Sequence, residues 1–188
     1  MMNKKEIILA TALKLFVENG FHGTATAKIA QEASVATGTL FNYFRTKDEL
    51  IFALYHLILK EMDDFILERM ESHSISKESF ESLFLSTVSW SLANPVHYHY
   101  LQQFSHSPYF KVALPTIENQ EEHPLFVLIK NGIDIVLIKQ LPVSFIYSLF
   151  TAQINGLHYY IISNDLSNEK QMELIKEAFE MLWKMIED

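Results

Sequence analysis

The 188-residue chain contains no cysteine. A disulfide framework, a thiolate metal site and a cysteine nucleophile are therefore excluded. The sequence also lacks a P-loop, an HExxH zinc motif and a nucleophile elbow, which are the patterns typical of several large enzyme classes. We accordingly predict a protein that is not an enzyme and that carries no cofactor or metal.

No segment of useful length alternates apolar and polar residues as a half-buried β-strand does. Two stretches, residues 82–110 and 140–164, contain no charged side chain and are long enough to raise the question of a membrane span. Proline and polar residues interrupt both, so buried helices of a bundle explain them better. The N-terminus has no apolar region followed by a small-residue cleavage site, and we therefore expect a cytoplasmic protein with no membrane partner.

Positive charge is scarce overall but unevenly distributed. The net charge is −8. Residues 1–60 carry seven Lys/Arg against five Asp/Glu, a net of +2, whereas residues 61–188 carry eight against eighteen, a net of −10. With 49% hydrophobic residues, the chain fits one small N-terminal domain and a larger body with a substantial core. The N-terminal part is the one suited to a nucleic acid.

Helical periodicity begins near the N-terminus. Ile8, Ala12 and Leu15 fall on one face of a helix predicted over residues 4–19. Gly20 follows, and glycine readily takes the left-handed conformation that ends a helix. Thr46 and Glu49 have the spacing of a capping box, which predicts another helix start at this point.

Two short helices lie between these points. The first is predicted over residues 27–33 with Thr26 as its N-cap, and the second over residues 37–44, after a turn at residues 34–36. Two short helices joined by a three-residue turn, the second with a polar outer face, describe a helix-turn-helix. The alternative is a solvated polar surface, because three-helix domains with small inward residues also occur in proteins that do not bind DNA.

The order and spacing of residues 8–50 resemble the TetR family of repressors. The resemblance rests on the segments ALKLF (12–16), NGF (19–21), TATAKIA (24–30) and TGTLFNYFRTKDEL (37–50). It implies an all-helical homodimer whose N-terminal domains bind a palindromic operator on double-stranded DNA. It further implies a C-terminal body that binds a small molecule and then releases the DNA. The rest of the chain resembles the family only in being helical and of the right length.

Position by position, the resemblance assigns DNA contacts to eight residues. Two lie at the start of the first short helix, five on the recognition helix, and one at a phosphate-binding position: Thr26, Lys28, Thr37, Gly38, Thr39, Asn42, Tyr43 and Lys47. The sequence departs from the family at Phe41, where a tyrosine is usual, and at Ser34 and Ala36, where glycine and Ser or Thr are common. These departures predict a missing phosphate-directed hydroxyl, some strain in the turn, and a recognition helix without its usual N-cap.

The body is predicted to be helical throughout. Helices are expected over residues 51–71, 77–93, 95–105, 125–140, 142–162 and 168–187, with breaks at Ser107–Pro108 and Leu114–Pro115. The fold class is therefore all-α, with about nine helices. We predict a helix-turn-helix domain over residues 1–47 and a ligand-binding and dimerisation domain over residues 48–188.

The first uncharged stretch is a candidate wall of a ligand pocket, because it combines aromatic side chains with a few polar groups. The candidate residues are Trp90, Tyr98, His99, Gln103, Phe104, His106 and Tyr109. The alternative is that these aromatics fill the core. His99, Gln103 and His106 share a helical face, but they lack a nearby carboxylate or cysteine, so a metal site is not favoured. The absence of charge suggests a small, mainly apolar effector.

The second uncharged stretch and the last helix are candidates for a dimer interface built as a four-helix bundle. The candidate residues are Phe145, Leu149, Ala152, Gly156, Leu174, Ala178 and Leu182. Packing within one subunit is the alternative. For the whole protein, the alternative function is a helical carrier of small molecules or lipids, or an enzyme, whose N-terminal domain serves only for docking.

Overall fold

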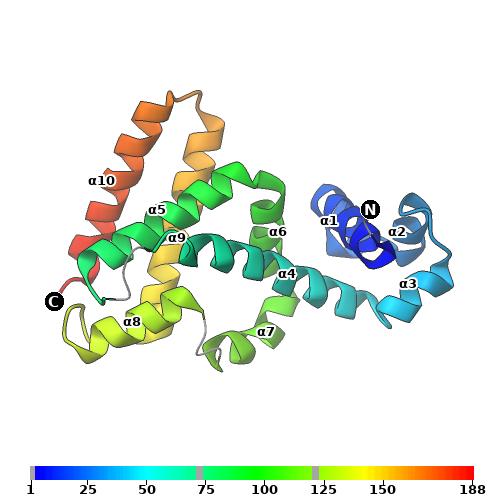
Figure 1. The fold of residues 1–188 in the computed structure, drawn as a ribbon, viewed down its shortest axis with the longest axis horizontal. Helices are drawn as coiled ribbons and strands as arrows, with labels where there is room; N and C mark the ends of the chain where they lie inside the picture. Colours follow the sequence, from blue (N-terminus) through cyan, green and yellow to red (C-terminus); the bar gives the residue numbers. More distant parts are fainter. Residues whose placement is uncertain (1–2, 71–73, 120–122) are drawn as a thin grey trace. The chain divides into compact units, whose positions relative to one another are not determined.

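The computed structural model describes residues 3–70, 74–119 and 123–188. Within these ranges the chain forms ten helices and no strand (Figure 1). They are α1 (Lys4–Gly23), α2 (Thr26–Glu32), α3 (Thr37–Tyr43), α4 (Lys47–Leu67), α5 (Lys77–Ala93), α6 (Pro95–Ser105), α7 (Pro108–Asn119), α8 (Pro124–Asp134), α9 (Val143–Ser163) and α10 (Asn168–Ile186). The all-α prediction is confirmed, with one helix more than expected.

The extra helix is α7, which runs through Leu114 and Pro115 where the sequence predicted a break. A proline inside a helix removes one backbone hydrogen bond, which weakens the helix but need not end it. None of the helices in the described part of the chain combines the length and the apolar character that a membrane crossing requires.

The chain divides into two compact units. The first comprises residues 1–61 and 94–113, and the second residues 62–93 and 114–188. The first unit is therefore larger than the predicted N-terminal domain of residues 1–47, because α6 packs on α1. The helix α4 continues along the chain from the first unit into the second.

The end of α1 is set by Gly20, as the sequence predicted. Gly20 has φ 71° and interrupts the helical backbone, and residues 21–23 add one more turn. The buried hydroxyl of Thr24 donates to the carbonyl oxygens of Leu15 (3.0 Å) and Gly20 (2.8 Å). These bonds cap the distorted end of α1 from inside the core.

The start of α2 differs from the prediction by one residue. Ala25 occupies the N-cap position without a side-chain bond, and Thr26 is the first residue of the helix. The predicted inward residues Ile29, Ala30 and Ala33 are all buried.

The turn between α2 and α3 has the strain that the resemblance implied. Ser34 adopts φ 54°, in the left-handed region that favours glycine. Ala36 is the N-cap of α3 and offers no side-chain bond. The turn is held by the backbone N–H of Val35, which donates to the carbonyl oxygen of Ala30 (3.0 Å).

The start of α4 carries a modified capping box. The hydroxyl of Thr46 accepts from the backbone N–H of Glu49 (3.0 Å), as predicted. The carboxylate of Glu49 reaches back to the N–H of Arg45 (2.8 Å), one residue earlier than in the usual box. These bonds fix the angle at which the chain passes from α3 into α4.

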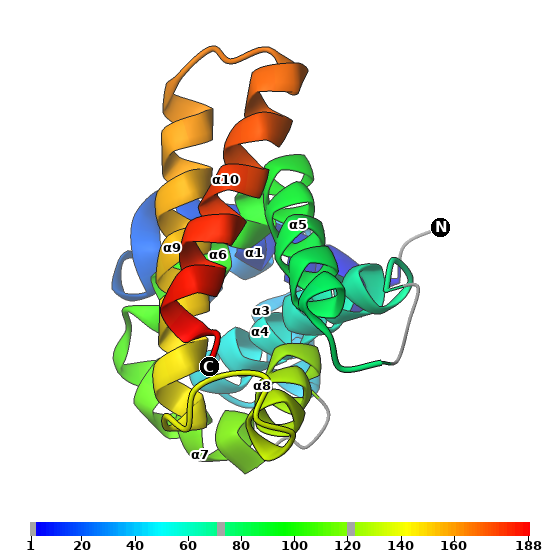
Figure 2. The same ribbon diagram turned by 90° about the vertical axis from the view of Figure 1, so that its left-hand side faces the viewer.

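The second unit is built around aromatic side chains. Phe80 and Phe84 of α5 contact Phe150 of α9, and Phe179 and Trp183 of α10 close the cluster. The helices α9 and α10 lie side by side and run in opposite directions, with α5 against both (Figure 2). The hydroxyl of Ser167 accepts from the backbone N–H of Lys170 and caps α10.

The helix α8 is shorter than the predicted helix over residues 125–140. It ends at Asp134, and Val136 then adopts φ 58°. The N–H of Leu137 donates to the carbonyl oxygen of Gly132 (2.9 Å), and the N–H of Val136 to that of Ile133 (3.0 Å). This is a Schellman motif with valine at the position usually held by glycine. The helix end could not be predicted because no glycine marks it.

Candidate DNA-binding surface and ligand cavity

The outer face of α3 is exposed and polar. Leu40 is fully buried and Phe44 is 2% exposed, so these two side chains anchor the helix on its inner face. The predicted recognition residues lie on the other side: Thr37, Gly38, Asn42 and Tyr43 are exposed, and Thr39 is half-buried. A helix supported on one side only, with hydroxyl and amide groups on the other, has the geometry of a major-groove reading helix.

Phe41 is 41% exposed on this helix. Its ring provides an apolar contact where a tyrosine would provide a hydroxyl. Apolar side chains contact the methyl group of thymine or the sugar in protein–DNA interfaces. Residue 41 therefore adds apolar area to the surface of α3.

Positive groups flank α3. Lys28 of α2 is exposed, and its ammonium lies 4.0 Å from the carboxylate of Glu32, a distance at which an exposed pair contributes little. Lys47 is half-buried at the first position of α4, where unsatisfied backbone N–H groups also favour an anion. Thr26 is half-buried at the start of α2. The eight predicted DNA-contact residues thus lie on three adjoining helix segments of the first unit.

Three of the residues predicted to line a ligand pocket, Phe104, Gln103 and Tyr109, make contacts between helices of the first unit. The ring of Phe104 is fully buried and stacks on Tyr55 of α4, with ring centroids 3.9 Å apart. The amide of Gln103 donates to the carbonyl oxygen of Val17 (3.1 Å), and the hydroxyl of Tyr109 to Asp48 (2.9 Å). Tyr98 is also buried. These contacts correspond to the core-filling alternative.

The other three pocket candidates are dispersed. Trp90 is buried in the second unit, whereas His99 and His106 are exposed. In the ranges that the structure describes, no three His, Asp or Glu side chains group together in a way that could hold a metal ion. The role of the seven residues as ligand contacts stays a prediction.

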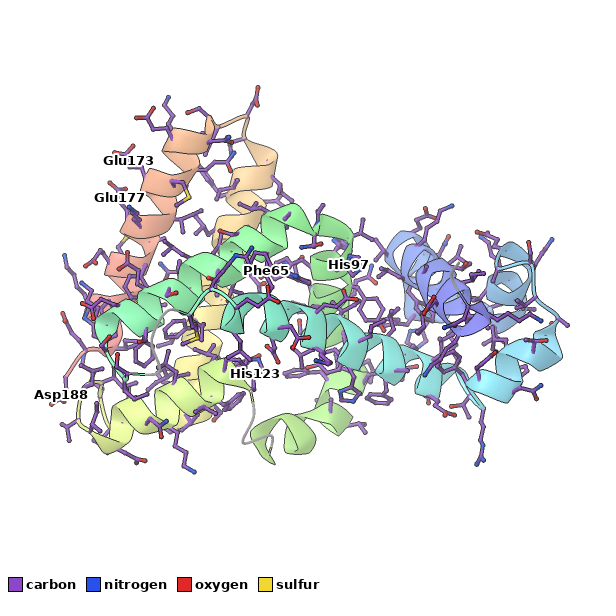
Figure 3. The ribbon with its side chains drawn as sticks, viewed as in Figure 1. Phe65, His97, His123, Glu173, Glu177 and Asp188 are labelled. Carbon is purple, nitrogen blue, oxygen red and sulfur yellow. The ribbon has the colours of Figure 1, made fainter. Side chains whose placement is uncertain are left out.

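A cavity of about 40 Å³ lies in the second unit, among α4, α5, α8 and α9. It is lined by Met62, Asp63, Ile66, Leu83, Thr87, His123, Pro124, Leu125, Tyr147, Thr151 and Ile154. Most of the wall is apolar, and the polar side chains include one carboxylate and one imidazole. Figure 3 shows His123 between α8 and the end of α4.

His123 and Asp63 form the polar centre of this cavity. The imidazole is 6% exposed, and its Nε2 lies 3.9 Å from Oδ1 of Asp63, whose side chain is 19% exposed. Burial lowers the pKa of His123 to about 4, so the ring is neutral near pH 7. Burial, together with the charge of Asp63, raises the pKa of Tyr147 to about 12.

Sequence reasoning missed both residues. Asp63 lies in the charged second half of a helix, and His123 lies 60 positions further along the chain, just before Pro124. Each looks ordinary in its own segment. The His–Pro pair was the local signal, but it indicates the start of a helix and not a binding group.

The predicted dimer residues fall into two groups. On α9, Phe145 is 49% exposed, Ala152 and Gly156 are exposed, and Leu149 is half-buried. Tyr159 and Tyr160 extend the exposed surface of this helix. A side chain added at Gly156 would meet nothing within 4 Å. The helix therefore presents an apolar face that its own chain leaves uncovered.

On α10 the exposed side differs from the predicted one. Ala178 and Leu182 are buried inside the subunit, and Leu174 is half-buried. Met181 and Met185 are instead more than half exposed, and Glu173 and Glu177 point outward from the same helix (Figure 3). The interior of the subunit therefore takes up two of the three predicted α10 residues.

The comparisons with known proteins agree with this arrangement. Residues 8–54 match the model of bacterial regulatory proteins, tetR family. A fatty acid metabolism regulator protein from Bacillus subtilis (strain 168) is 39% identical over 64 residues, which cover 34% of this chain and 31% of that protein. This match thus spans about a third of the relative's length.

Solved structures match over the whole chain. A protein from Shewanella sp. PV-4, described as a tetR family transcription regulator, is 30% identical, with a TM-score of 0.91 and coverage of 100% of both chains. The transcriptional regulator FadR from Bacillus subtilis, in complex with stearoyl-CoA, is 21% identical, with a TM-score of 0.70 over 94% of this chain and 96% of that one. The second likeness concerns the fold alone.

A helix-turn-helix with an exposed polar second helix, joined to a helical body, defines a transcriptional regulator. The particular family follows from the match at residues 8–54 and from the full-length likeness to the Shewanella protein. The chain belongs to the TetR family of transcriptional regulators.

Proposed function

We propose that this protein is a repressor that binds a palindromic operator as a homodimer and is released by a small molecule. The observation that carries this proposal is the outer face of α3, where Asn42 and Tyr43 are exposed while Leu40 holds the helix from below. Asparagine can pair with adenine through two hydrogen bonds, and hydroxyl groups reach both bases and phosphates.

The α9–α10 surface is the proposed dimer interface. Phe145, Met181 and Met185 leave apolar area exposed on these two helices. Two copies of the pair would bury this area in a four-helix bundle with two-fold symmetry. A symmetric pair of recognition helices then matches operator half-sites about 34–36 Å apart.

The cavity around His123 is the proposed effector site. Met62 and Ile66 line it, and both belong to α4, the helix that begins at Lys47 beside the DNA-contact residues. A ligand that displaces this end of α4 also moves the other end, because a helix transmits displacement along its axis. Such a ligand weakens DNA binding only to the extent that it prefers the released state.

Duplex binding tests the proposal directly. An operator is selected from random duplexes with the full-length protein, and affinity is measured by fluorescence anisotropy over a range of salt concentrations. Thr39→Ala and Asn42→Ala should relax sequence preference, each by about tenfold at its base pair. Lys47→Ala should weaken binding to all duplexes alike and reduce the salt slope by about one unit.

Lys130→Ala is the matched control, since Lys130 is an exposed lysine on α8 of the second unit. It should leave both affinity and salt slope unchanged. Absence of binding to any duplex at low ionic strength would favour the alternative of a helical carrier. Repression is checked by placing the selected operator over a promoter, where the protein should lower transcription.

A further inference from the structure

Phe41 exposes an apolar ring on the outer side of the recognition helix α3. Of the residues of α1 to α3, all of which the structure describes, Phe41 (41% exposed) and Tyr43 (43% exposed) are the large apolar side chains that stay exposed. Leu40 and Phe44 already hold α3 on its inner face, so the ring of Phe41 is not needed as an anchor. An exposed ring gains the free energy of apolar burial only when a partner covers it.

The neighbouring Gly38 is a second feature that the protein by itself does not explain. It lies inside α3, three residues before Phe41, and its backbone does not have the positive φ that favours glycine. A Cβ atom added at this position would meet nothing within 4 Å. Glycine also weakens a helix compared with alanine. Neither packing nor backbone conformation within the protein requires this glycine, whereas the close approach of a second molecule would.

Phe41 and Gly38 lie on the same side of α3. Residues three or four positions apart are neighbours on a helix surface, and each side chain leans toward the N-terminus of its helix. This rule places the ring of Phe41 over Gly38, where no side chain covers the helix. Thr37 and Asn42, both exposed, border the resulting apolar spot. The spot faces the N-terminal end of α3, which is the end of a recognition helix that contacts base edges.

A small apolar spot of this kind matches one group in the major groove. The base edges there carry hydrogen-bond donors and acceptors, and thymine adds a methyl group at C5. The phenyl ring of Phe41 cannot pair with a donor or acceptor, but it can cover a methyl group. The missing side chain of Gly38 lets that group approach the helix backbone. The sugar is the other apolar part of a duplex, but it lies along the phosphate backbone and carries no sequence information.

We propose that Phe41 and Gly38 form the contact site for the methyl group of one thymine in each half of the bound DNA sequence. Phe41 is then a specificity-determining residue, which selects a T·A pair over a C·G pair at that position. The existence of a specific operator with two half-sites rests on the function proposed above. The thymine contact itself concerns the surface of a single α3 helix.

The test uses the duplex selected from random sequences with the unaltered full-length protein. Each thymine of one half-site is replaced in turn by deoxyuridine, which keeps the base pair and removes only the methyl group. One of these replacements should weaken binding about fourfold, the factor expected for the burial of one methyl group. At the same position, 5-methylcytosine opposite guanine should be bound more tightly than cytosine opposite guanine, because it restores the methyl group.

Variants assign the contact to a side chain. Phe41→Ala should bind the thymine duplex and the deoxyuridine duplex equally well. Tyr43→Ala is the matched control, because it removes the other exposed ring of the same helix. It should weaken binding but keep the preference for thymine. Gly38→Ala should reduce this preference without lowering thermal stability, since the added Cβ meets nothing inside the protein.

Three results overturn the proposal: no thymine whose replacement by deoxyuridine weakens binding, a preference for thymine that persists in Phe41→Ala, or a preference that Tyr43→Ala abolishes as well. If Phe41→Ala weakens binding to all duplexes alike and keeps the preference, the ring contacts the sugar–phosphate backbone instead. These results leave sequence-specific DNA binding by the unaltered protein standing. Failure to bind any duplex removes the proposed function and this inference together, so the two failures are distinguishable.

Discussion

The hydroxyl of Tyr100 donates a 2.8 Å hydrogen bond to the backbone carbonyl oxygen of Ile51. Tyr100 belongs to α6 and Ile51 to α4, so the bond joins two helices of the first unit that are distant in sequence. The tyrosine is fully buried, and burial raises its pKa. Its ring also contacts Phe16 and Phe21 of α1. One side chain thus ties α6 to both α1 and α4.

Tyr100→Phe should lower the free energy of unfolding by about 1 kcal/mol, because the ring contacts remain while one buried hydrogen bond is lost. Urea denaturation followed by circular dichroism measures the change. Tyr43→Phe is the control, since Tyr43 is 43% exposed and its substitution should leave stability unchanged. Equal stabilities of the two variants would contradict the structural role of the bond.

Val136→Gly should stabilise the protein by about 1 kcal/mol. Val136 has φ 58° at the end of α8, a conformation that strains a β-branched residue but not glycine. The side chain is 57% exposed, so little apolar burial is lost. Val136→Ala removes the same methyl groups and keeps the strain, so a gain confined to the glycine variant in thermal unfolding identifies the backbone as the cause.

Stability should fall as the pH drops from about 6.5 to about 4, in part through His123. The folded protein holds the pKa of this residue at about 4, whereas an unfolded chain has the ordinary value of about 6.5. Between these values the unfolded state binds the additional proton, so acid favours unfolding by up to about 1.4 kcal/mol per pH unit. Asp63, at 3.9 Å, attracts the protonated ring and moderates the effect.

His123→Phe removes this titration. Urea midpoints measured at pH 5 and pH 7.5 should therefore differ less in the variant than in the unaltered protein. Parallel pH profiles of the two proteins would mean that folding does not lower the pKa of His123.

Gly156→Lys should convert the protein to a monomer without loss of helix content. The position leaves space for a side chain within the subunit, but a charge there would lie inside the proposed interface and remain unpaired. Light scattering gives the oligomeric state, and operator affinity should fall with it. Ala93→Lys, at an exposed site at the end of α5, should stay dimeric. A dimeric Gly156→Lys variant would place the interface elsewhere.

Local rules predicted most helix boundaries. Gly20 ends the regular part of α1, Ser167 caps α10, and Pro124 opens α8. Each works through backbone conformation or one short-range hydrogen bond, and these depend on neighbouring residues alone. The rules failed at Pro115, which lies inside α7, and at Val136, which has a positive φ. Both backbone conformations are locally unfavourable for these residue types.

The sequence by itself determined the helix-turn-helix and the family, because the residues that specify α1 to α3 are close together in the chain. It also determined that the body is helical, through the periodicity of its apolar residues. Only the tertiary structure decided which apolar stripes face inward, and so placed Leu182 inside the subunit and Met181 on its surface. Only folding brought Asp63 to 3.9 Å from His123. Contacts between distant segments depend on how several helices pack at once, and no single segment encodes that packing.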